Sequence, residues 1–398
     1  MFMAQRVLIL NTLAFFVCFA AWVLFGVLIT FLKKSGLVSW DQTQTGWLLG
    51  LPILTGSLLR LPVGALADRF GGRTVFPLLM FVSAGAMWGL SFVHETIGFV
   101  IGGLGIGLAG ASFAVGVAHT SRWFDRSRQG TALGIFGIGN SGAAVTGLVA
   151  PILLDRLTMQ GQHPEGWRQL PLIYAAVLVV MAILFYVGLG PDLGRAPGRS
   201  SAPLKNLRVW RFGLYYFCFF GGFVALSQWL VPYSVQVFGV PLKEAGLIAA
   251  IFSFPVGLVR ALGGWSADRW GARPVLYGVL IGALFCSLVL GVFGTNRVFF
   301  IPFVFILGML MGIGMGAVYQ HIPHYFPQEV GSVGGLIGVI GGLGGFLLPT
   351  LFGWLLDRTG HWTSCWFVLS CLLGGSLFWM HRVVRRLTRL SRLESQYG

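Results

Sequence analysis

Twelve apolar segments, each about as long as a membrane-spanning helix, follow one another along the chain. A helix needs roughly 20 apolar residues to cross the hydrocarbon core of a bilayer. Only 10% of the 398 residues are charged, against about 25% in soluble proteins. The sequence therefore predicts an all-α membrane protein whose twelve transmembrane helices lie near residues 7–32, 43–67, 74–93, 96–119, 130–153, 170–189, 209–236, 242–267, 274–294, 298–320, 331–355 and 362–382.

The first half of the sequence is repeated in the second half. RLPVGALADRFGGR at 60–73 aligns with RALGGWSADRWGAR at 260–273, and GNSGAAVTGLVAPILLDR at 139–156 aligns with GGLGGFLLPTLFGWLLDR at 341–358. Two matches in the same order indicate two six-helix bundles related by a pseudo-twofold axis along the membrane normal. The domains expected are an N-terminal bundle at 1–189, a Pro-, Gly- and Ser-rich linker at 190–206, a C-terminal bundle at 207–382 and a basic tail at 383–398.

The distribution of basic residues predicts the orientation. Twelve spans place both termini on one side, and 18 of the 27 lysines and arginines lie on that side, against 7 on the other. Cytoplasmic loops carry an excess of Lys and Arg, so we expect a cell (inner) membrane protein with both termini in the cytoplasm. The net charge of +15 then reflects membrane topology, and no nucleic-acid partner is expected.

Two basic residues, Arg60 and Arg260, fit in no loop. Arg60 precedes Asp68, at the end of the second span, by eight residues. At about 1.5 Å per residue it is roughly 12 Å deeper in the membrane. The repeat places Arg260 at the same depth in the eighth span. Arginine at the centre of a membrane helix costs about 2.5–3.5 kcal/mol or more, and such residues usually face the interior of the bundle.

Two explanations of these arginines are open, a structural ion pair and an external anion. All twelve acidic residues fall in loops or at helix ends of the predicted spans, so no carboxylate is expected at the midplane. A guanidinium group matches a planar oxyanion with two parallel, charge-assisted hydrogen bonds. The sequence therefore favours a small anion held between Arg60 and Arg260.

Motifs elsewhere in the chain resemble a known family. GALADRFGGR and its repeat GWSADRWGAR resemble the loop motif of the major facilitator superfamily, while GIFGIGNSGAAVTGLVAP (134–151) and GLIGVIGGLGGFLLP (335–349) resemble the two signatures of its nitrate/nitrite porter family. The resemblance covers nearly the whole chain. It implies the major facilitator fold and a secondary active transporter that moves nitrate and nitrite by alternating access, not an enzyme.

The resemblance also implies a substrate site. Arg60 and Arg260 match the arginines that clamp the anion, and Asn140 matches the signature asparagine. Tyr216 matches a tyrosine of the seventh span, although Tyr215 stands beside it. The aromatic walls of the site correspond to Phe113, Phe220 and Tyr319, the last a departure if phenylalanine is the norm. Gly342 stands where the first signature has Asn140, so the polar contacts of the two halves are expected to differ.

Conformational roles are expected for two further sets of residues. Rows of glycine allow helices to pack closely, and a smooth glycine face can slide as one half rocks against the other. The aspartates of the two loop motifs would form salt bridges that hold one conformation. The residues in these sets are Gly137, Gly139, Gly142, Gly338, Gly341 and Gly344, and Asp68 and Asp268.

The mode of transport has several readings at this point. A site without a carboxylate favours nitrate/nitrite exchange, whereas the short chain is similar to family members that use proton symport. Another small anion, such as cyanate or a short carboxylate, is an alternative substrate, and an anion receptor without flux is a remote one. The expected partners are nitrate, nitrite, protons and membrane lipid. The transporter is expected to be a monomer with no cofactor or metal.

Overall fold

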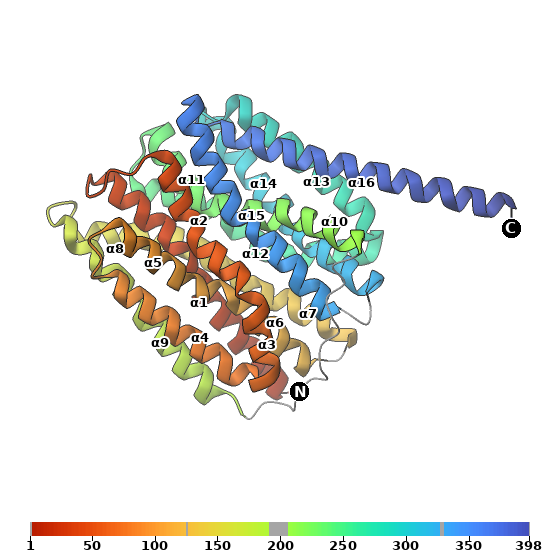
Figure 1. Cartoon of the computed structure of the whole chain (residues 1–398), viewed down its shortest axis with the longest axis horizontal. Helices are drawn as coiled ribbons and strands as arrows, with labels where there is room; N and C mark the ends of the chain where they lie inside the picture. The colour runs from red at the N-terminus through yellow and green to blue at the C-terminus, as the bar shows by residue number, and fades with distance from the viewer. Residues whose placement is uncertain (1, 125, 191–205, 327–329, 398) are drawn as a thin grey trace.

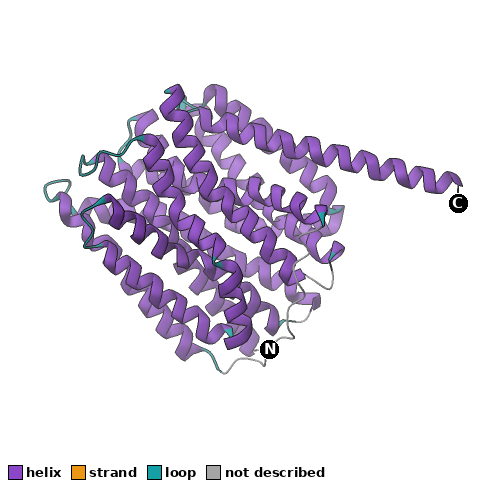
Figure 2. Ribbon diagram, viewed as in Figure 1, coloured by secondary structure: helices purple, strands orange, loops and turns teal. Residues whose placement is uncertain are grey.

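The computed structural model describes residues 2–124, 126–190, 206–326 and 330–397, and these form helices joined by short loops, with no strand among them (Figures 1 and 2). Twelve helical segments within these ranges are long and apolar enough to cross a membrane. The predicted number of spans is therefore confirmed. The expected linker at 190–206 lies almost entirely outside the described residues, and the domain boundaries stay predictions.

Six spans precede that gap. They are α1 (Phe2–Lys34), α2 and α3 (Gln42–Leu58 and Arg60–Phe70), α4 (Gly72–Leu90), α5, η1 and α6 (Thr96–Ile106, Gly107–Ala111 and Ser112–Trp123), α7, η2 and α8 (Arg126–Gly137, Ile138–Ser141 and Gly142–Leu157), and η3 and α9 (Pro164–Arg168 and Gln169–Gly188).

Six more spans follow the gap. They are α10, η4 and α11 (Leu207–Tyr216, Phe217–Gly221 and Gly222–Phe238), α12 (Leu242–Trp270), α13 (Ala272–Phe293), α14 (Arg297–Tyr325), α15 (Val330–Thr359) and α16 (Ser364–Tyr397). The last helix continues well beyond the bundle (Figure 1). The residues expected as a separate tail therefore extend the twelfth span as one continuous helix.

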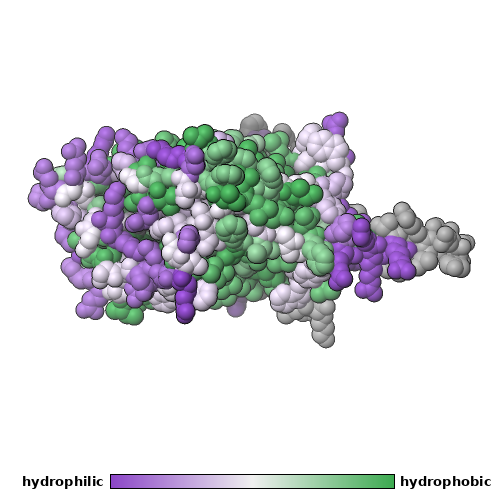
Figure 3. Space-filling view, turned by 90° about the horizontal axis from the view of Figure 1, so that it is seen from above, coloured by the Kyte–Doolittle hydropathy of each residue, from purple (hydrophilic) through white to green (hydrophobic). Residues whose placement is uncertain are grey.

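The bundle has two ends, separated by an apolar belt. Green, hydrophobic side chains form a band across the middle of the molecule, with purple, hydrophilic ones toward both ends (Figure 3). Both termini lie at one end, which we call the near end, together with Gly71 and Gly271. The opposite, far end carries the loops that follow α1, α4 and α8. A belt of this kind is what a bilayer requires of the helices that cross it.

The glycines of the repeated loop motif have a backbone role. Gly71 ends α3 with φ of 86°, and Gly271 ends α12 with φ of 84°. Residues other than glycine rarely adopt this region. The two turns that join spans two to three and eight to nine therefore share one geometry, which explains why glycine stands at both positions of the repeat.

Four spans are interrupted near mid-membrane. Leu59 separates α2 from α3, two 3-10 segments (η1 and η2) interrupt the fourth and fifth spans, and the π-helical η4 interrupts the seventh. The pseudo-twofold counterparts of spans two, four and five are the continuous helices α12, α14 and α15. Glycine weakens helix propensity, and such irregular turns often mark functional positions.

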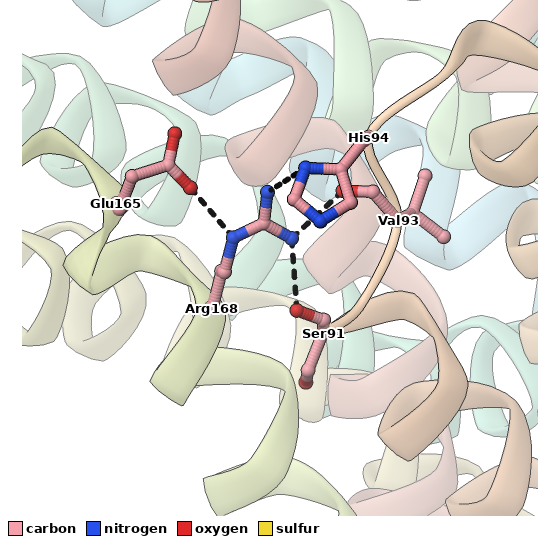
Figure 4. A network of polar contacts seen from close by, with 5 residues as sticks. All are labelled: Ser91, Val93, His94, Glu165 and Arg168. Carbon is pink, nitrogen blue, oxygen red and sulfur yellow. Dashed lines mark hydrogen bonds and ion pairs between the residues drawn. The ribbon is translucent and has the colours of Figure 1, made fainter.

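A polar network holds the far-end loops of the first half together (Figure 4). Arg168 donates to the carbonyl oxygens of Ser91 and Val93 at 2.9 and 2.7 Å. It also pairs with Glu165 at 2.6 Å and contacts Nδ1 of His94 at 3.0 Å. One side chain thus ties the loop after α4 to the start of the sixth span.

Candidate functional site

Arg60 and Arg260 are both buried, with 4% and 7% of their surface exposed. Arg60 is the first residue of α3, directly after the interruption at Leu59, whereas Arg260 lies within the continuous helix α12. The guanidinium carbons of both lie 5.4 Å from the centroid of the Phe113 ring. The structure therefore brings together two arginines that are 200 residues apart in the sequence.

Arg60 makes its hydrogen bond to the opposite half of the molecule. Its Nη1 donates to the carbonyl oxygen of Gly338 on α15 at 2.7 Å. Its guanidinium carbon also lies 4.9 Å from the centre of the Phe220 ring. The Nε atom is buried and has no hydrogen-bond partner among the described residues. One donor of this side chain is therefore available to a ligand.

Arg260 makes its hydrogen bond within its own half. Its Nη2 donates to the hydroxyl of Tyr216 at 3.3 Å, and its guanidinium carbon lies 5.5 Å from the centre of the Tyr319 ring. Its Nη1 is buried without a partner in the described part of the chain. A guanidinium beside an aromatic face gains about 0.5–2 kcal/mol, and aromatic rings thus stabilise both cations.

Neither arginine forms an ion pair with any carboxylate whose side chain the structure describes. The described ion pairs, Arg168 with Glu165 and Arg297 with Glu244, lie at the far end. A structural ion pair was one explanation that the sequence left open. Among the described residues, the groups that contact the two guanidinium groups are aromatic rings, a carbonyl oxygen and a hydroxyl. None of these groups carries a negative charge.

Asn140 is fully buried in η2, and neither its amide nitrogen nor its amide oxygen has a partner among the residues described. An unsatisfied buried polar group costs about 1–3 kcal/mol. Asn140 follows Gly137 by three residues, and a Cβ on Gly137 would lie 3.2 Å from Cδ of Arg260. This places the amide on the same stretch of chain that contacts Arg260.

Two serines for which the sequence predicts no role share these properties. The hydroxyls of Ser57 and Ser141 are buried and have no described partner. Each lies against a glycine of the other half, Ser57 against Gly342 and Ser141 against Gly257. Their positions in the sequence are what could have indicated a role, because Ser57 precedes Arg60 by less than one helical turn and Ser141 follows Asn140.

The predicted aromatic residues form one cluster. The Tyr216 ring is stacked on Phe220 at 5.1 Å and meets Tyr319 edge to face at 4.9 Å, while Phe113 lies 6.4 Å from Tyr319. The hydroxyl of Tyr319 donates to the carbonyl oxygen of Gly334 at 3.0 Å. Tyr216 lies at Arg260, and Tyr215 lines a separate pocket.

Comparison with known proteins assigns the chain to a family. The sequence profile of the Major Facilitator Superfamily matches residues 10–349. The "Probable nitrate/nitrite antiporter NarK1" of Thermus thermophilus is 43% identical, with 96% of this chain and 92% of that protein aligned. The "Nitrite extrusion protein" of Bacillus subtilis (strain 168) is 28% identical, with 96% of each chain aligned. The chain belongs to the major facilitator superfamily and, within it, to the nitrate/nitrite porters.

The fold agrees with this assignment. A bacterial homologue of the human lysosomal transporter Spinster, in an inward-facing and occupied conformation, superimposes with a TM-score of 0.76 at 16% identity, covering 96% of this chain and 97% of that one. The two predicted six-helix bundles are therefore those of the major facilitator fold. Members of this superfamily are multi-pass membrane transporters that work by alternating access.

The six signature glycines for which a conformational role is expected separate into two groups. Gly137 lies against Arg260 and Gly338 against Arg60, each across the boundary between the halves. The others pack within their own half: a Cβ on Gly139 or Gly142 would meet α1, and a Cβ on Gly341 or Gly344 would meet the seventh span. Of these six glycines, Gly137 and Gly338 face the opposite half, as Gly134, Gly335 and Gly342 of the same signatures also do.

Of the two loop-motif aspartates, the structure describes the side chain of Asp268 only. Asp268 is exposed and accepts a hydrogen bond from Gln320 of α14 in the same half. This contact is a hydrogen bond within the C-terminal half, and the salt bridge expected there has no counterpart among the described ion pairs. The side chain of Asp68 lies outside the described residues, so its expected gating role stays a prediction.

Proposed function

We propose that this porter carries nitrate and nitrite across the cell (inner) membrane by alternating access, with one anion bridging Arg60 and Arg260. The observation that carries the proposal is the pair of buried guanidinium groups, each 5.4 Å from the ring of Phe113, in a chain 43% identical to a protein named as a nitrate/nitrite antiporter. Planar forks of this kind suit a flat oxyanion.

The unpartnered donors supply the contacts that such an anion needs. Nε of Arg60, Nη1 of Arg260 and Nδ2 of Asn140 are all buried without a described partner. Charge-assisted hydrogen bonds contribute about 1.5–3 kcal/mol each. Phe113, Phe220 and Tyr319 form walls that exclude water and lower the local dielectric, which strengthens these bonds. Tyr216 orients Arg260.

We propose that the near end is cytoplasmic. With the termini placed there, the excess of basic residues, 18 against 7, follows the positive-inside rule. The extended α16 then projects into the cytoplasm (Figure 1).

The contacts between the halves support a state closed at the far end. A Cβ on Gly46 or Gly353 would strike backbone atoms of the opposite half. Closer to the near end the spacing relaxes, since a Cβ on Gly134 would lie 3.8 Å from Ala261 and one on Gly335 would lie 4.0 Å from Leu61. Rocking about the site would open the far end and close the near end.

A carboxylate adds a polar closure at the far end. Asp357 of α15 accepts hydrogen bonds from the backbone nitrogens of Gln42 and Thr43, at 3.2 and 2.6 Å, and from the Thr43 hydroxyl. Anions are favoured at helix N-termini, so the second half of the molecule caps a helix of the first half. We call this interaction the Asp357 cap and propose that it holds the far end shut.

The site favours exchange over proton symport as the mode of transport. No carboxylate whose side chain is described lies at Arg60 or Arg260 to take up a proton with the anion. Two facing guanidinium groups repel each other when no anion lies between them. The return of the carrier would therefore require a second anion, which makes the exchange of nitrate for nitrite obligatory.

Proteoliposomes test both the substrate and the mode. We expect uptake of labelled nitrate only when the vesicles contain nitrite or nitrate, with no stimulation by an imposed pH gradient. Uptake into anion-free vesicles driven by an inward proton gradient would instead establish symport. Cyanate and formate in excess should compete weakly. If either competes better than nitrate, or if nitrate binds without counterflow, the proposed substrate or transport activity is wrong.

A further inference from the structure

A second cationic pocket lies at the near end of the C-terminal half, between α10, α13, α14 and α16. Arg211 and Arg273 line it together with the apolar residues Met380, Val383 and Val384. The guanidinium groups of the transport site belong to α3 and α12, so neither contributes to this pocket. We call it the near-end pocket.

Three arginines gather around one tyrosine there. Nη2 of Arg273 donates to the hydroxyl of Tyr325 at 2.7 Å, and the guanidinium carbon of Arg208 lies 5.1 Å from the centre of the same ring. Arg211 is half-buried and is close enough to Arg208 and Arg273 to be repelled by both. None of the three is in an ion pair with a carboxylate among the described side chains.

The charge of this group favours an external anion. Arg208 and Arg273 are exposed and Arg211 is half-buried, and a half-buried charge is screened less by salt than an exposed one. The guanidinium fork binds phosphate oxygens in pairs, which a single ammonium does not reproduce. A phosphate group at Arg211 and Arg273 would therefore relieve repulsion that the protein itself leaves in place.

The apolar part of the lining determines what kind of phosphate fits. Val383 and Val384 are apolar, half-buried and part of this lining. They belong to α16, a helix long and apolar enough to cross the membrane. A ligand with a phosphate at one end and hydrocarbon at the other matches both the arginines and these valines, whereas a free ion would use the arginines alone.

The extension of α16 adds charge of the same sign. Arg382, Arg385 and Arg386 are exposed on this helix just beyond Met380. Basic pockets between transmembrane helices on the cytoplasmic side bind anionic lipid headgroups. We propose that the near-end pocket binds an anionic phospholipid of the leaflet at that end, which is the cytoplasmic one in the orientation proposed above, with its phosphate at Arg211 and Arg273 and its acyl chain along Val383 and Val384.

Native mass spectrometry of the purified full-length transporter tests this proposal. Phosphatidylglycerol and phosphatidylethanolamine are added at equal concentration, and the occupancy of each is measured. We expect phosphatidylglycerol to bind at least tenfold more tightly, because phosphatidylethanolamine has the same phosphate but adds an ammonium group whose positive charge is repelled by the arginines. Equal occupancy by the two lipids in the unaltered protein would overturn the proposal, whatever the behaviour of any variant.

Paired variants then locate the site. Arg211→Gln with Arg273→Gln should lower phosphatidylglycerol affinity at least tenfold. Arg69→Gln with Arg269→Gln removes the same charge from exposed near-end positions outside the pocket, and it should leave affinity within about twofold. Equal losses in both pairs would reduce the effect to net charge and refute the pocket.

Inorganic phosphate distinguishes a lipid from a free ion. At concentrations that saturate phosphatidylglycerol binding, phosphate should raise the melting temperature of the transporter less than the lipid does. Phosphate that protects as well as the lipid, and displaces it completely, would make the pocket a site for a free anion and overturn the lipid assignment.

Discussion

The two arginines of the transport site occupy equivalent places in the repeat and are held in different ways. Arg60 follows an interruption of its span and bonds across the molecule to Gly338, at 2.7 Å. Arg260 lies in an unbroken helix and bonds to Tyr216 of its own half, at 3.3 Å. Arg60 thus links the two halves, whereas Arg260 bonds within one half. The two arginines occupy equivalent positions in the repeat but make different contacts.

The neighbours of the arginines differ in the same sense. Polar side chains come from the N-terminal half, where Ser57, Asn140 and Ser141 stand. The C-terminal half meets them with Gly257 and Gly342. Asn140 aligns with Gly342 and Ser57 with Gly257 in the repeat. At these aligned positions the N-terminal half carries polar groups beside the anion site, and the C-terminal half carries glycines that allow the halves to approach.

The largest effect is expected from replacing either arginine by lysine. Arg60→Lys and Arg260→Lys each keep the charge and lose the planar fork. With about 1.5–3 kcal/mol lost per charge-assisted bond, nitrate counterflow should fall about 10- to 100-fold in both variants. Arg69→Lys, at an exposed near-end position, is the control. Unchanged counterflow in either site variant would remove that arginine from the proposed clamp.

A substitution at Gly342, where the two halves lie close together, should have the next largest effect on transport. A methyl group there would overlap the hydroxyl of Ser57, and overpacking costs about 1–3 kcal/mol. Gly342→Ala should therefore lower counterflow about tenfold, and the added change Ser57→Gly should restore part of it. Gly264→Ala has open space around it and serves as the control. A double variant as impaired as Gly342→Ala would contradict this contact.

Loss of the amide at position 140 should have a smaller effect. Asn140→Ala removes a neutral hydrogen bond to the anion, worth about 0.5–1.5 kcal/mol. We expect the KM for nitrate to rise about two- to tenfold with little change in protein yield. A lower KM, or a better-folded protein with normal transport, would mean that Asn140 does not contact the substrate.

The Asp357 cap is a further difference between the two halves. Asp155 is its counterpart in the repeat, yet α12 has no side-chain cap at its start. Asp357→Asn should therefore increase the population open at the far end about fivefold, as expected for a loss of ~1 kcal/mol, and Asp155→Asn should not. Electron–electron distances between spin labels at Ser35 and His361, measured in a Cys371→Ser background, report this opening. An unchanged distance distribution in Asp357→Asn would show that the cap does not hold the far end closed.

The smallest effect is expected at Tyr216. Tyr216→Phe removes the 3.3 Å contact with Arg260 and keeps the stacked ring against Phe220. Nitrate counterflow should fall only a few-fold, because the aromatic support of the guanidinium remains. Tyr215→Phe is the matched control, since that side chain lines the near-end pocket instead. A larger loss from Tyr215→Phe would reverse the assignment of the two tyrosines.

The sequence by itself determined the twelve spans, the duplication and the two buried arginines. Apolar length decides whether a segment crosses a bilayer, and a charge inside such a segment must face the interior of the bundle. These are local properties, so Arg60 and Arg260 follow from the residues alone, whereas Phe113, Phe220 and Tyr319 follow from the resemblance to the nitrate/nitrite porters.

The tertiary structure decided how the helices are rotated and how closely they pack. It alone placed Tyr216 rather than Tyr215 at Arg260, set Ser57 on Gly342, and showed that Gly139 and Gly341 pack within their own halves. It also placed Asp357 at the start of α2, 314 residues away in sequence from Thr43. Interruptions such as η2 and η4 change the rotation of a span, and helical periodicity carries no information about which neighbour each face will meet.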